Sequence, residues 1–159
     1  MSLSRRLLLV IVAAALLVGG AWLWRACTET DEAKILRVVE EARTSIEEKS
    51  LRGVTGLLSP DYQDNLGLTA QSVRPMLQRL FLGVQSIRVD VANLSVSVIG
   101  PDGTAGVSLD AAVSGSLQDQ PVYLMGTPDQ RARVTLTLIK DGRTWLVREV
   151  DGIRLPELE

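Results

Sequence analysis

The sequence contains no histidine, one cysteine and few aromatic residues. Without histidine, the chain lacks the commonest general base, the commonest zinc ligand and the usual partner of a serine or cysteine nucleophile. Because Cys27 is the single cysteine, neither an internal disulfide nor a cysteine-cluster metal site can form. We therefore expect no metal and no cofactor, and a folded domain must be held together by packing alone.

The sequence also has little net charge. The chain has 17 basic and 19 acidic residues and a formal net charge of −2. Two of the basic residues, Arg5 and Arg6, lie at the extreme N-terminus, so the rest of the chain is more acidic than the whole. With no basic patch, the sequence argues against binding to nucleic acid, and it makes an anionic membrane surface a poor partner for the domain itself.

One long apolar run is present, at residues 7–24. As a helix rising 1.5 Å per residue it would span roughly 27 Å, close to the ~30 Å hydrocarbon core of a bilayer. Arg5 and Arg6 before it favour an internal N-terminus, and Trp22 and Trp24 suit the outer interface. The sequence predicts a single-pass protein of the cell membrane whose C-terminal domain faces the periplasm or the exterior.

Three interpretations of this N-terminal segment differ in whether it is retained. We favour an uncleaved signal anchor within residues 1–27, because the run is long for the ~7–15-residue apolar region of a cleaved signal peptide. The alternatives are cleavage after residues 19–21 and a lipoprotein acylated at Cys27. Residues 4–9 also resemble a twin-arginine signal. In each case residues 28–159 form an extracytoplasmic domain.

The first half of that domain has the pattern of helices. Apolar residues recur at helical spacing between residues 33 and 46, with glutamates on the opposite side. A short helix is expected at residues 51–58, and Ser59-Pro60 reads as a cap and first helical position. A third helix runs to about residue 82, and we place its start near Ser72 so that Pro75 lies in the first turn.

The second half has the period-two alternation of strands. Asp141-Gly142 predicts a two-residue hairpin that pairs Leu138 with Trp145 and Val134 with Glu149, ending the core face in a carboxylate. A four-residue loop at residues 100–103 is expected to pair Val98 with Ala105, Val96 with Val107 and Leu94 with Leu109. Residues 117–130 read as a strand end followed by a long loop.

These elements predict an α+β fold with about three helices packed on a curved antiparallel sheet. The order of helices before long strands, the Leu57-to-Tyr62 segment and the final Asp141-to-Val147 segment resemble the NTF2-like (SnoaL-like, cystatin-like α+β) superfamily over roughly residues 30–155. The resemblance implies a cone between sheet and helices whose open end is the usual pocket. It implies little about function, because this superfamily contains isomerases, dehydratases, transport factors and secretion-system scaffolds.

The expected cone would bring a small set of amphipathic residues to its open end. The ligand-pocket candidates are Tyr62, Tyr123, Trp145 and Glu149. Asp61 and Asp64 flank Tyr62 and could serve acid–base chemistry or bind a cation, although Asp61 fits a helix start after Pro60. We assign no catalytic residue, since histidine is absent and no aspartate falls clearly on the inward face of the strands.

The outward sheet face is rich in small polar residues and includes a few apolar ones. We place on it Ser95, Ser97, Ser108, Ser114, Thr135, Thr137, Thr144, Ile139, Leu146 and Val150. Such a face can be solvated, or it can pair two copies into a homodimer. The sequence thus favours a membrane-tethered binding or accessory domain for a small apolar ligand or an envelope protein. A scaffold in an envelope or secretion complex and an isomerase- or dehydratase-type enzyme are the alternatives.

Overall fold

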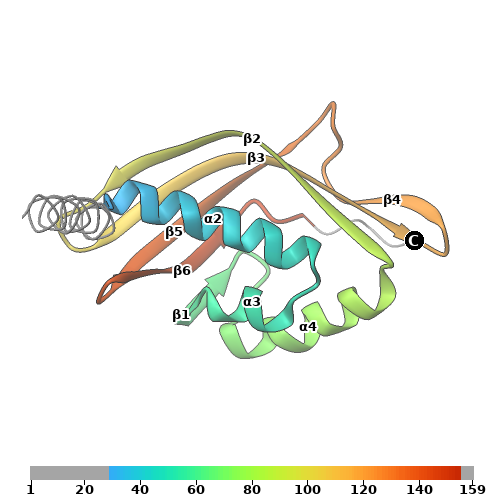
Figure 1. Cartoon of the computed structure of the whole chain (residues 1–159), viewed down its shortest axis with the longest axis horizontal. Helices are drawn as coiled ribbons and strands as arrows, with labels where there is room; N and C mark the ends of the chain where they lie inside the picture. The colour runs from blue at the N-terminus through green and yellow to red at the C-terminus, as the bar shows by residue number, and fades with distance from the viewer. Residues whose placement is uncertain (1–28, 155–159) are drawn as a thin grey trace, which may run out of the picture. The chain divides into compact units, whose positions relative to one another are not determined.

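The computed structural model describes residues 29–154, so the predicted membrane segment at residues 7–24 and the predicted boundary between residues 27 and 28 lie outside the described residues. From Lys34 onward the described residues belong to one compact unit. Within residues 29–154, no helix has the length and apolar character needed to cross a membrane. The elements follow the predicted order, with helices before most of the strands (Figure 1).

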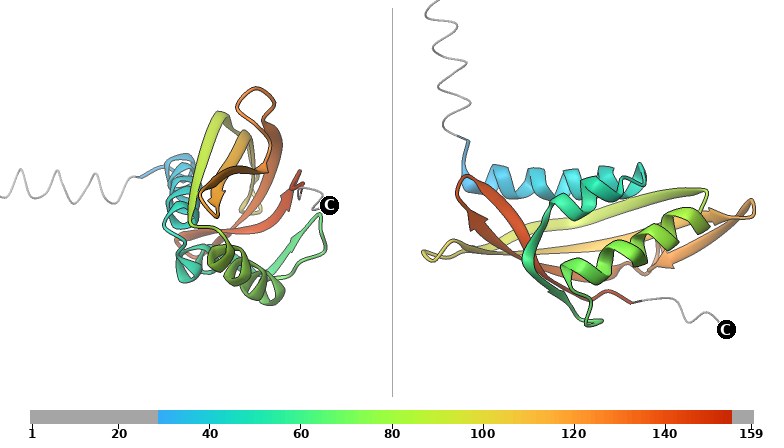
Figure 2. Two further views of the ribbon diagram at one scale, coloured as in Figure 1. Left: turned by 90° about the vertical axis from the view of Figure 1, so that its right-hand side faces the viewer. Right: turned by 90° about the horizontal axis from the view of Figure 1, so that it is seen from below.

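Three helices cover one face of the sheet (Figures 1 and 2). They are α2 (Asp31–Glu47), α3 (Leu51–Gly56) and α4 (Ala70–Gly83). The apolar stripe of α2 buries Ile35, Val38 and Val39, as its spacing predicts. The start of α4 was predicted wrongly at Ser72, because Thr69 and Ser72 form a capping box that begins the helix at Ala70.

The sheet has six strands in the order β1-β6-β5-β3-β2, with β4 also paired to β3. The strands are β1 (Leu58–Asp64), β2 (Ser86–Ile99), β3 (Thr104–Leu117), β4 (Gln120–Met125), β5 (Ala132–Asp141) and β6 (Thr144–Asp151). The prediction of a purely antiparallel sheet is wrong, because β1 runs parallel to β6. The sheet is therefore mixed.

Strand β1 replaces the helical turn predicted at Ser59-Pro60. Leu58 pairs with Val147 and Asp64 with Val150 of β6, and the Val147 N–H donates to the Leu57 carbonyl at 2.8 Å. The cap-and-proline signature is local, whereas this pairing joins residues almost ninety positions apart. The long-range hydrogen bonds decide the conformation of the segment.

The β5–β6 hairpin differs from its predicted register. Its loop is Gly142-Arg143, with Gly142 at a φ of 60°, so Leu138 pairs with Val147 instead of Trp145. A bulge then follows in β6, which pairs Glu149 with Thr137 and leaves it exposed. The prediction that the core face ends in the carboxylate of Glu149 is therefore wrong.

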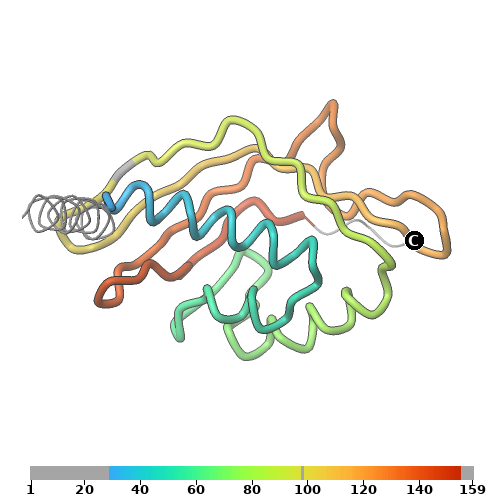
Figure 3. The backbone as a smooth tube through the Cα atoms, viewed as in Figure 1, coloured from blue at the N-terminus to red at the C-terminus, as the bar shows by residue number. Residues whose placement is uncertain are grey.

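The long β2–β3 hairpin matches its prediction in part (Figure 3). Its turn is present, because the Gly103 N–H donates to the Gly100 carbonyl at 3.2 Å, and Val96 pairs with Val107 as expected. The predicted Val98–Ala105 and Leu94–Leu109 pairs are wrong, since two irregularities shift the register. One of them lies at Asn93, where φ is 51° and the strand bulges.

The long loop predicted at residues 117–130 is also wrong. Strand β3 continues to Leu117 and turns through Gln118-Asp119, both at positive φ, into β4. Pro121 is accommodated because β4 lies at the edge of the sheet there, where a missing N–H breaks no ladder. A shorter loop, from Gly126 to Arg131, then leads into β5.

Candidate functional site

The helices and the inward face of the sheet line a cavity of about 290 Å³ that is partly open to solvent. Its wall is almost wholly apolar, since every strand places valine, leucine, alanine or methionine there at alternate positions. From the helices come Val39, Ala42, Ile46, Val54, Val73, Met76 and Leu77, and from the strands Val89, Val91, Leu109, Ala111, Val113, Met125, Val134, Leu136, Val147 and Val150. Val150 was predicted on the outward face. The bulge in β6 turns it inward.

Three polar side chains interrupt this apolar wall: Arg43, Tyr62 and Asp64. Tyr62 and Asp64 lie on β1 and are both buried, with 5% and 7% of their surface exposed. The Tyr62 hydroxyl donates to Oδ2 of Asp64 at 3.3 Å. The other carboxylate oxygen, Oδ1, accepts the backbone N–H groups of Leu66 and Leu68 at 2.9 Å each. The Asp64 carboxylate is therefore held by its own loop, and Asp64 lines both this cavity and a neighbouring polar hollow.

The surroundings of Tyr62 keep its hydroxyl protonated. Burial raises the pKa of the phenol well above its ordinary value of 10.0, and the adjacent Asp64 carboxylate raises that pKa further through its charge and its hydrogen bond. At neutral pH the group is therefore a hydrogen-bond donor and acceptor and does not act as a base.

Arg43 of α2 reaches the cavity wall from a cluster of charges. Its guanidinium is paired with Glu40 at 2.5 Å and with Glu47 at 3.2 Å. The second oxygen of Glu47 accepts the backbone N–H of Val89 at 2.9 Å and so ties α2 to the edge strand β2. The Arg43 guanidinium also lowers the pKa of Glu40.

The structure separates the four ligand-pocket candidates. Tyr62 lines the cavity. Trp145 is buried at 2% exposure, and the Lys140 ammonium lies 5.9 Å from its ring, but Trp145 does not contribute to the cavity wall. Tyr123 is 53% exposed on β4, and Glu149 is exposed beside Arg148 in a polar hollow that shares Asp64 with the cavity.

Asp64 is the site residue whose role sequence reasoning missed. It was noticed as one of two carboxylates beside Tyr62, but the predicted helical turn gave it no inward direction. Read as a strand, residues 62 and 64 point to the same side, and their burial agrees with that reading.

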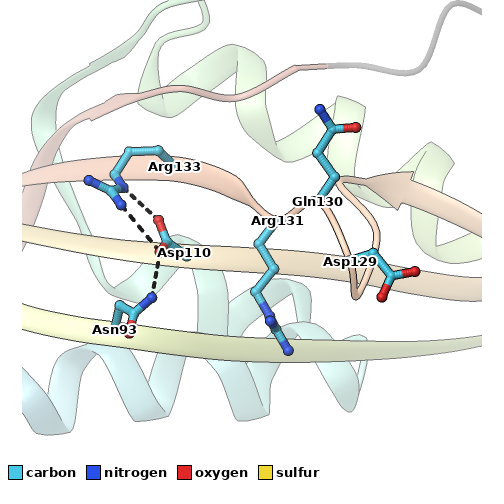
Figure 4. Close-up of a pocket in the computed structure, with 6 residues that line it drawn as sticks. All are labelled: Asn93, Asp110, Asp129, Gln130, Arg131 and Arg133. Atoms are coloured by element: carbon cyan, nitrogen blue, oxygen red, sulfur yellow. Dashed lines mark hydrogen bonds and ion pairs between the residues drawn. The ribbon is translucent and has the colours of Figure 1, made fainter.

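A second hollow lies on the opposite, outward face of the sheet (Figure 4). Arg133 donates to Asp110, and the Asn93 amide of the β2 bulge donates to the same carboxylate at 2.8 Å. The hydrogen bond from Arg133 has the larger effect and that from Asn93 the smaller one, and together they hold the pKa of Asp110 below its ordinary value. Arg131 pairs with Asp90 at 2.6 Å. These pairs are accessible to water and contribute little to stability. A homodimer through this face stays a prediction.

In the described part of the chain, no three histidine, cysteine or carboxylate side chains gather in a way that could hold a metal ion. The tyrosine–aspartate pair can offer hydrogen bonds to a bound molecule, and the apolar wall can exclude water from it. The geometry of the site is thus that of a small hydrophobic cavity with one polar point on β1 and an arginine on α2.

No family model matches the sequence, and no curated protein matches it either. Solved structures do resemble the fold. A protein of Novosphingobium aromaticivorans described as a candidate aromatic ring hydroxylase is 15% identical, with a TM-score of 0.65 over 79% of this chain and 90% of its own. A second from that organism, described as a candidate scytalone dehydratase, is 11% identical, with a TM-score of 0.65 over 77% and 87%.

A third structure, from Streptomyces avermitilis, is described as a candidate dehydratase of the NTF2-like family. It is 14% identical, with a TM-score of 0.62 over 76% of this chain and 93% of its own. At such identities the likeness establishes the fold alone. The domain has the NTF2-like fold that the sequence resemblance indicated, but its curved sheet is mixed and not antiparallel throughout.

Proposed function

We propose that this NTF2-like domain binds a small apolar molecule in the cavity between its helices and its sheet. The observation that carries the proposal is the 290 Å³ cavity with its apolar wall. When the cavity is empty, its apolar wall is in contact with water. A ligand that covers this wall would recover the free energy of burying it and would stabilise the folded state. A scaffold would have no need of such a space.

The volume sets the size of the ligand. An apolar cavity of roughly 150 Å³ is known to hold benzene, and typical ligand pockets are about 300–1,000 Å³. A cavity near the lower end of that range suits a bicyclic aromatic molecule or a compact terpene-like one. Naphthalene is the probe of choice, because it fills about the right space and makes no hydrogen bond.

The test measures the thermal unfolding midpoint of the full chain in lipid nanodiscs with and without naphthalene. A ligand that binds the folded state alone raises the midpoint. We expect a rise in the wild type and none in Ala42→Leu/Ala111→Leu, whose added atoms occupy the cavity. Ala92→Leu, which adds atoms on the other side of β2, is the matched control and should keep the rise. An equal rise in the filled variant would mean that naphthalene binds elsewhere or acts through the lipid.

The second part of the proposal is that residues 7–24 tether this domain to the outer side of the cell membrane. It is supported by the length of the apolar run and by the arginines and tryptophans at its two ends. Extraction of membranes with alkaline carbonate should leave the protein in the pellet, and the intact mass should include residue 1 or 2. A mature protein beginning at Trp22 or at a lipidated Cys27 would contradict the anchor.

An isomerase- or dehydratase-type activity is a second candidate. The observation in its favour is the buried pair of Tyr62 and Asp64 beside the cavity, since a protonated phenol and a carboxylate can together move a proton. The Asp64 carboxylate already has structural partners on both oxygens, the N–H groups of Leu66 and Leu68 and the Tyr62 hydroxyl. This favours binding over catalysis.

A further inference from the structure

The chemistry of Asp64 restricts what the cavity can hold. A carboxylate accepts hydrogen bonds at two oxygens and can take about four in all. Oδ1 of Asp64 already accepts two strong ones, from Leu66 and Leu68. Oδ2 accepts one long bond of 3.3 Å from Tyr62. Oδ2 can thus accept a further hydrogen bond, in a residue that is 93% buried and lines both the apolar cavity and the polar hollow beside Arg148 and Glu149.

Every buried polar side-chain atom of the described residues has at least one partner, so a cost arises only when a ligand covers the remaining acceptor position of Oδ2 without using it. A charged group in an apolar environment loses its hydration, and each missing hydrogen bond leaves part of that loss uncompensated. A ligand that brings a hydrogen-bond donor to Oδ2 removes the cost. A ligand that brings only an acceptor adds repulsion between lone pairs.

We propose that the cavity selects apolar molecules that carry one hydroxyl group, which donates to Oδ2 of Asp64. This inference rests on the proposed binding function and adds the ligand class and the residue that sets it. Tyr62 is a positioning residue in this account, because its hydroxyl holds Oδ2 in place from the β1 side. A neutral hydroxyl is favoured over an ammonium group because an ammonium would lose its hydration in an almost wholly apolar cavity, which costs far more than desolvating a hydroxyl.

Three naphthalene compounds of similar size test the preference for a hydroxyl group separately from the binding of an apolar molecule. Naphthalene has no polar group, 2-naphthol can donate a hydrogen bond, and 2-methoxynaphthalene can only accept one. Their dissociation constants are measured by titration calorimetry on the full chain in lipid nanodiscs, after subtraction of the heats from Ala42→Leu/Ala111→Leu. We expect the wild type to bind 2-naphthol about tenfold or more tightly than 2-methoxynaphthalene.

Asp64→Asn is the matched variant. The asparagine can keep its carbonyl oxygen on the N–H groups of Leu66 and Leu68 and puts an N–H₂ donor where Oδ2 stood. The affinity for 2-naphthol relative to that for 2-methoxynaphthalene should therefore fall at least tenfold in Asp64→Asn. If Asp64→Asn does not fold, the ratio of the wild-type affinities for 2-naphthol and 2-methoxynaphthalene still tests the preference for a hydroxyl group.

The outcomes are distinct. Binding of naphthalene with equal affinities for 2-naphthol and 2-methoxynaphthalene would overturn the hydroxyl inference and leave the proposed function standing. An unchanged ratio in folded Asp64→Asn would overturn the role of Asp64. A wild type that binds none of the three would overturn the proposed function together with this inference.

Discussion

At the scale of single residues, the buried polar side chains of β1 and the lysine after α2 have the clearest physical roles. Sequence reasoning found Tyr62 as an amphipathic residue but missed the role of Asp64, because the inward direction of a side chain depends on whether the backbone is helix or strand. It also missed Lys49, since its partners lie more than thirty residues away. Contacts of this kind leave no local pattern.

The raised pKa of Tyr62 makes stability depend on alkaline pH. In the unfolded chain the phenol ionises near its ordinary pKa of 10.0, whereas in the folded chain it keeps its proton. Stability is therefore unaffected by this group below about pH 10 and falls as the pH rises above it. Urea denaturation followed by circular dichroism should show this fall in the wild type and a smaller one in Tyr62→Phe.

Tyr123→Phe, at an exposed position, is the control and should follow the wild type. Below pH 10, Tyr62→Phe should also be less stable by about 1 kcal/mol through loss of its hydrogen bond to Asp64. Parallel curves for the wild type and Tyr62→Phe above pH 10 would show that the phenol ionises as readily in the folded state as in the unfolded one.

Lys49 joins the end of α2 to the end of α4. Its ammonium donates to the carbonyls of Phe81, Val84 and Gln85 at 3.0–3.3 Å, where a helix terminus leaves carbonyls without partners. We expect Lys49→Met to lower the free energy of unfolding by about 1–3 kcal/mol. Arg79→Met, at an exposed position of α4, should change it by less than about 0.5 kcal/mol. Equal effects of the two substitutions would argue against this capping role.

At the scale of elements, the sequence predicted those that depend on local periodicity and missed those that depend on distant pairing. The helices α2 and α3 and most of the strands were expected from their apolar spacing. Strand β1 was missed because its partner β6 lies at the other end of the chain. The Asn93 bulge does have a signal, since the inward positions change from odd to even numbers after Val91.

The β3–β4 turn was missed because its residues are unusual. Gln118 and Asp119 have φ values of 50° and 63°, as a type I′ turn requires, but asparagine and glycine are the residues that favour it. Gln118→Asn/Asp119→Gly should therefore stabilise the domain by roughly 1 kcal/mol in urea denaturation.

Asp102→Gly, in the turn between β2 and β3, is the opposing control. Its carboxylate accepts hydrogen bonds from the N–H and hydroxyl of Thr104, so this variant should lose stability. A destabilised Gln118→Asn/Asp119→Gly would mean that the side chains lost from the β3–β4 turn matter more than its backbone strain.

At the scale of the whole domain, the fold class and a pocket between helices and sheet could be predicted, but the size of the cavity and most of its lining could not. Helices followed by long strands point to an α+β arrangement, and the NTF2-like resemblance holds for the described residues. An empty space is a property of how side chains from every element meet, so no single segment of sequence encodes it. The membrane tether at residues 7–24 stays a prediction.

Filling the cavity should stabilise the domain. Ala42 lies on α2 in the cavity wall, and a leucine there adds apolar contacts where little has to move. We expect Ala42→Leu to raise the free energy of unfolding by about 0.5–2 kcal/mol. Loss of stability instead would mean that the side chains already fill this space in solution.

The most direct test of ligand binding in the cavity is a crystal structure of the chain grown with 2-naphthol. We predict that the two rings lie between α2 and the sheet, against Val91, Leu109 and Val134, with the hydroxyl within hydrogen-bonding distance of Oδ2 of Asp64. A cavity closed by its own side chains, with 2-naphthol bound elsewhere or absent, would contradict it.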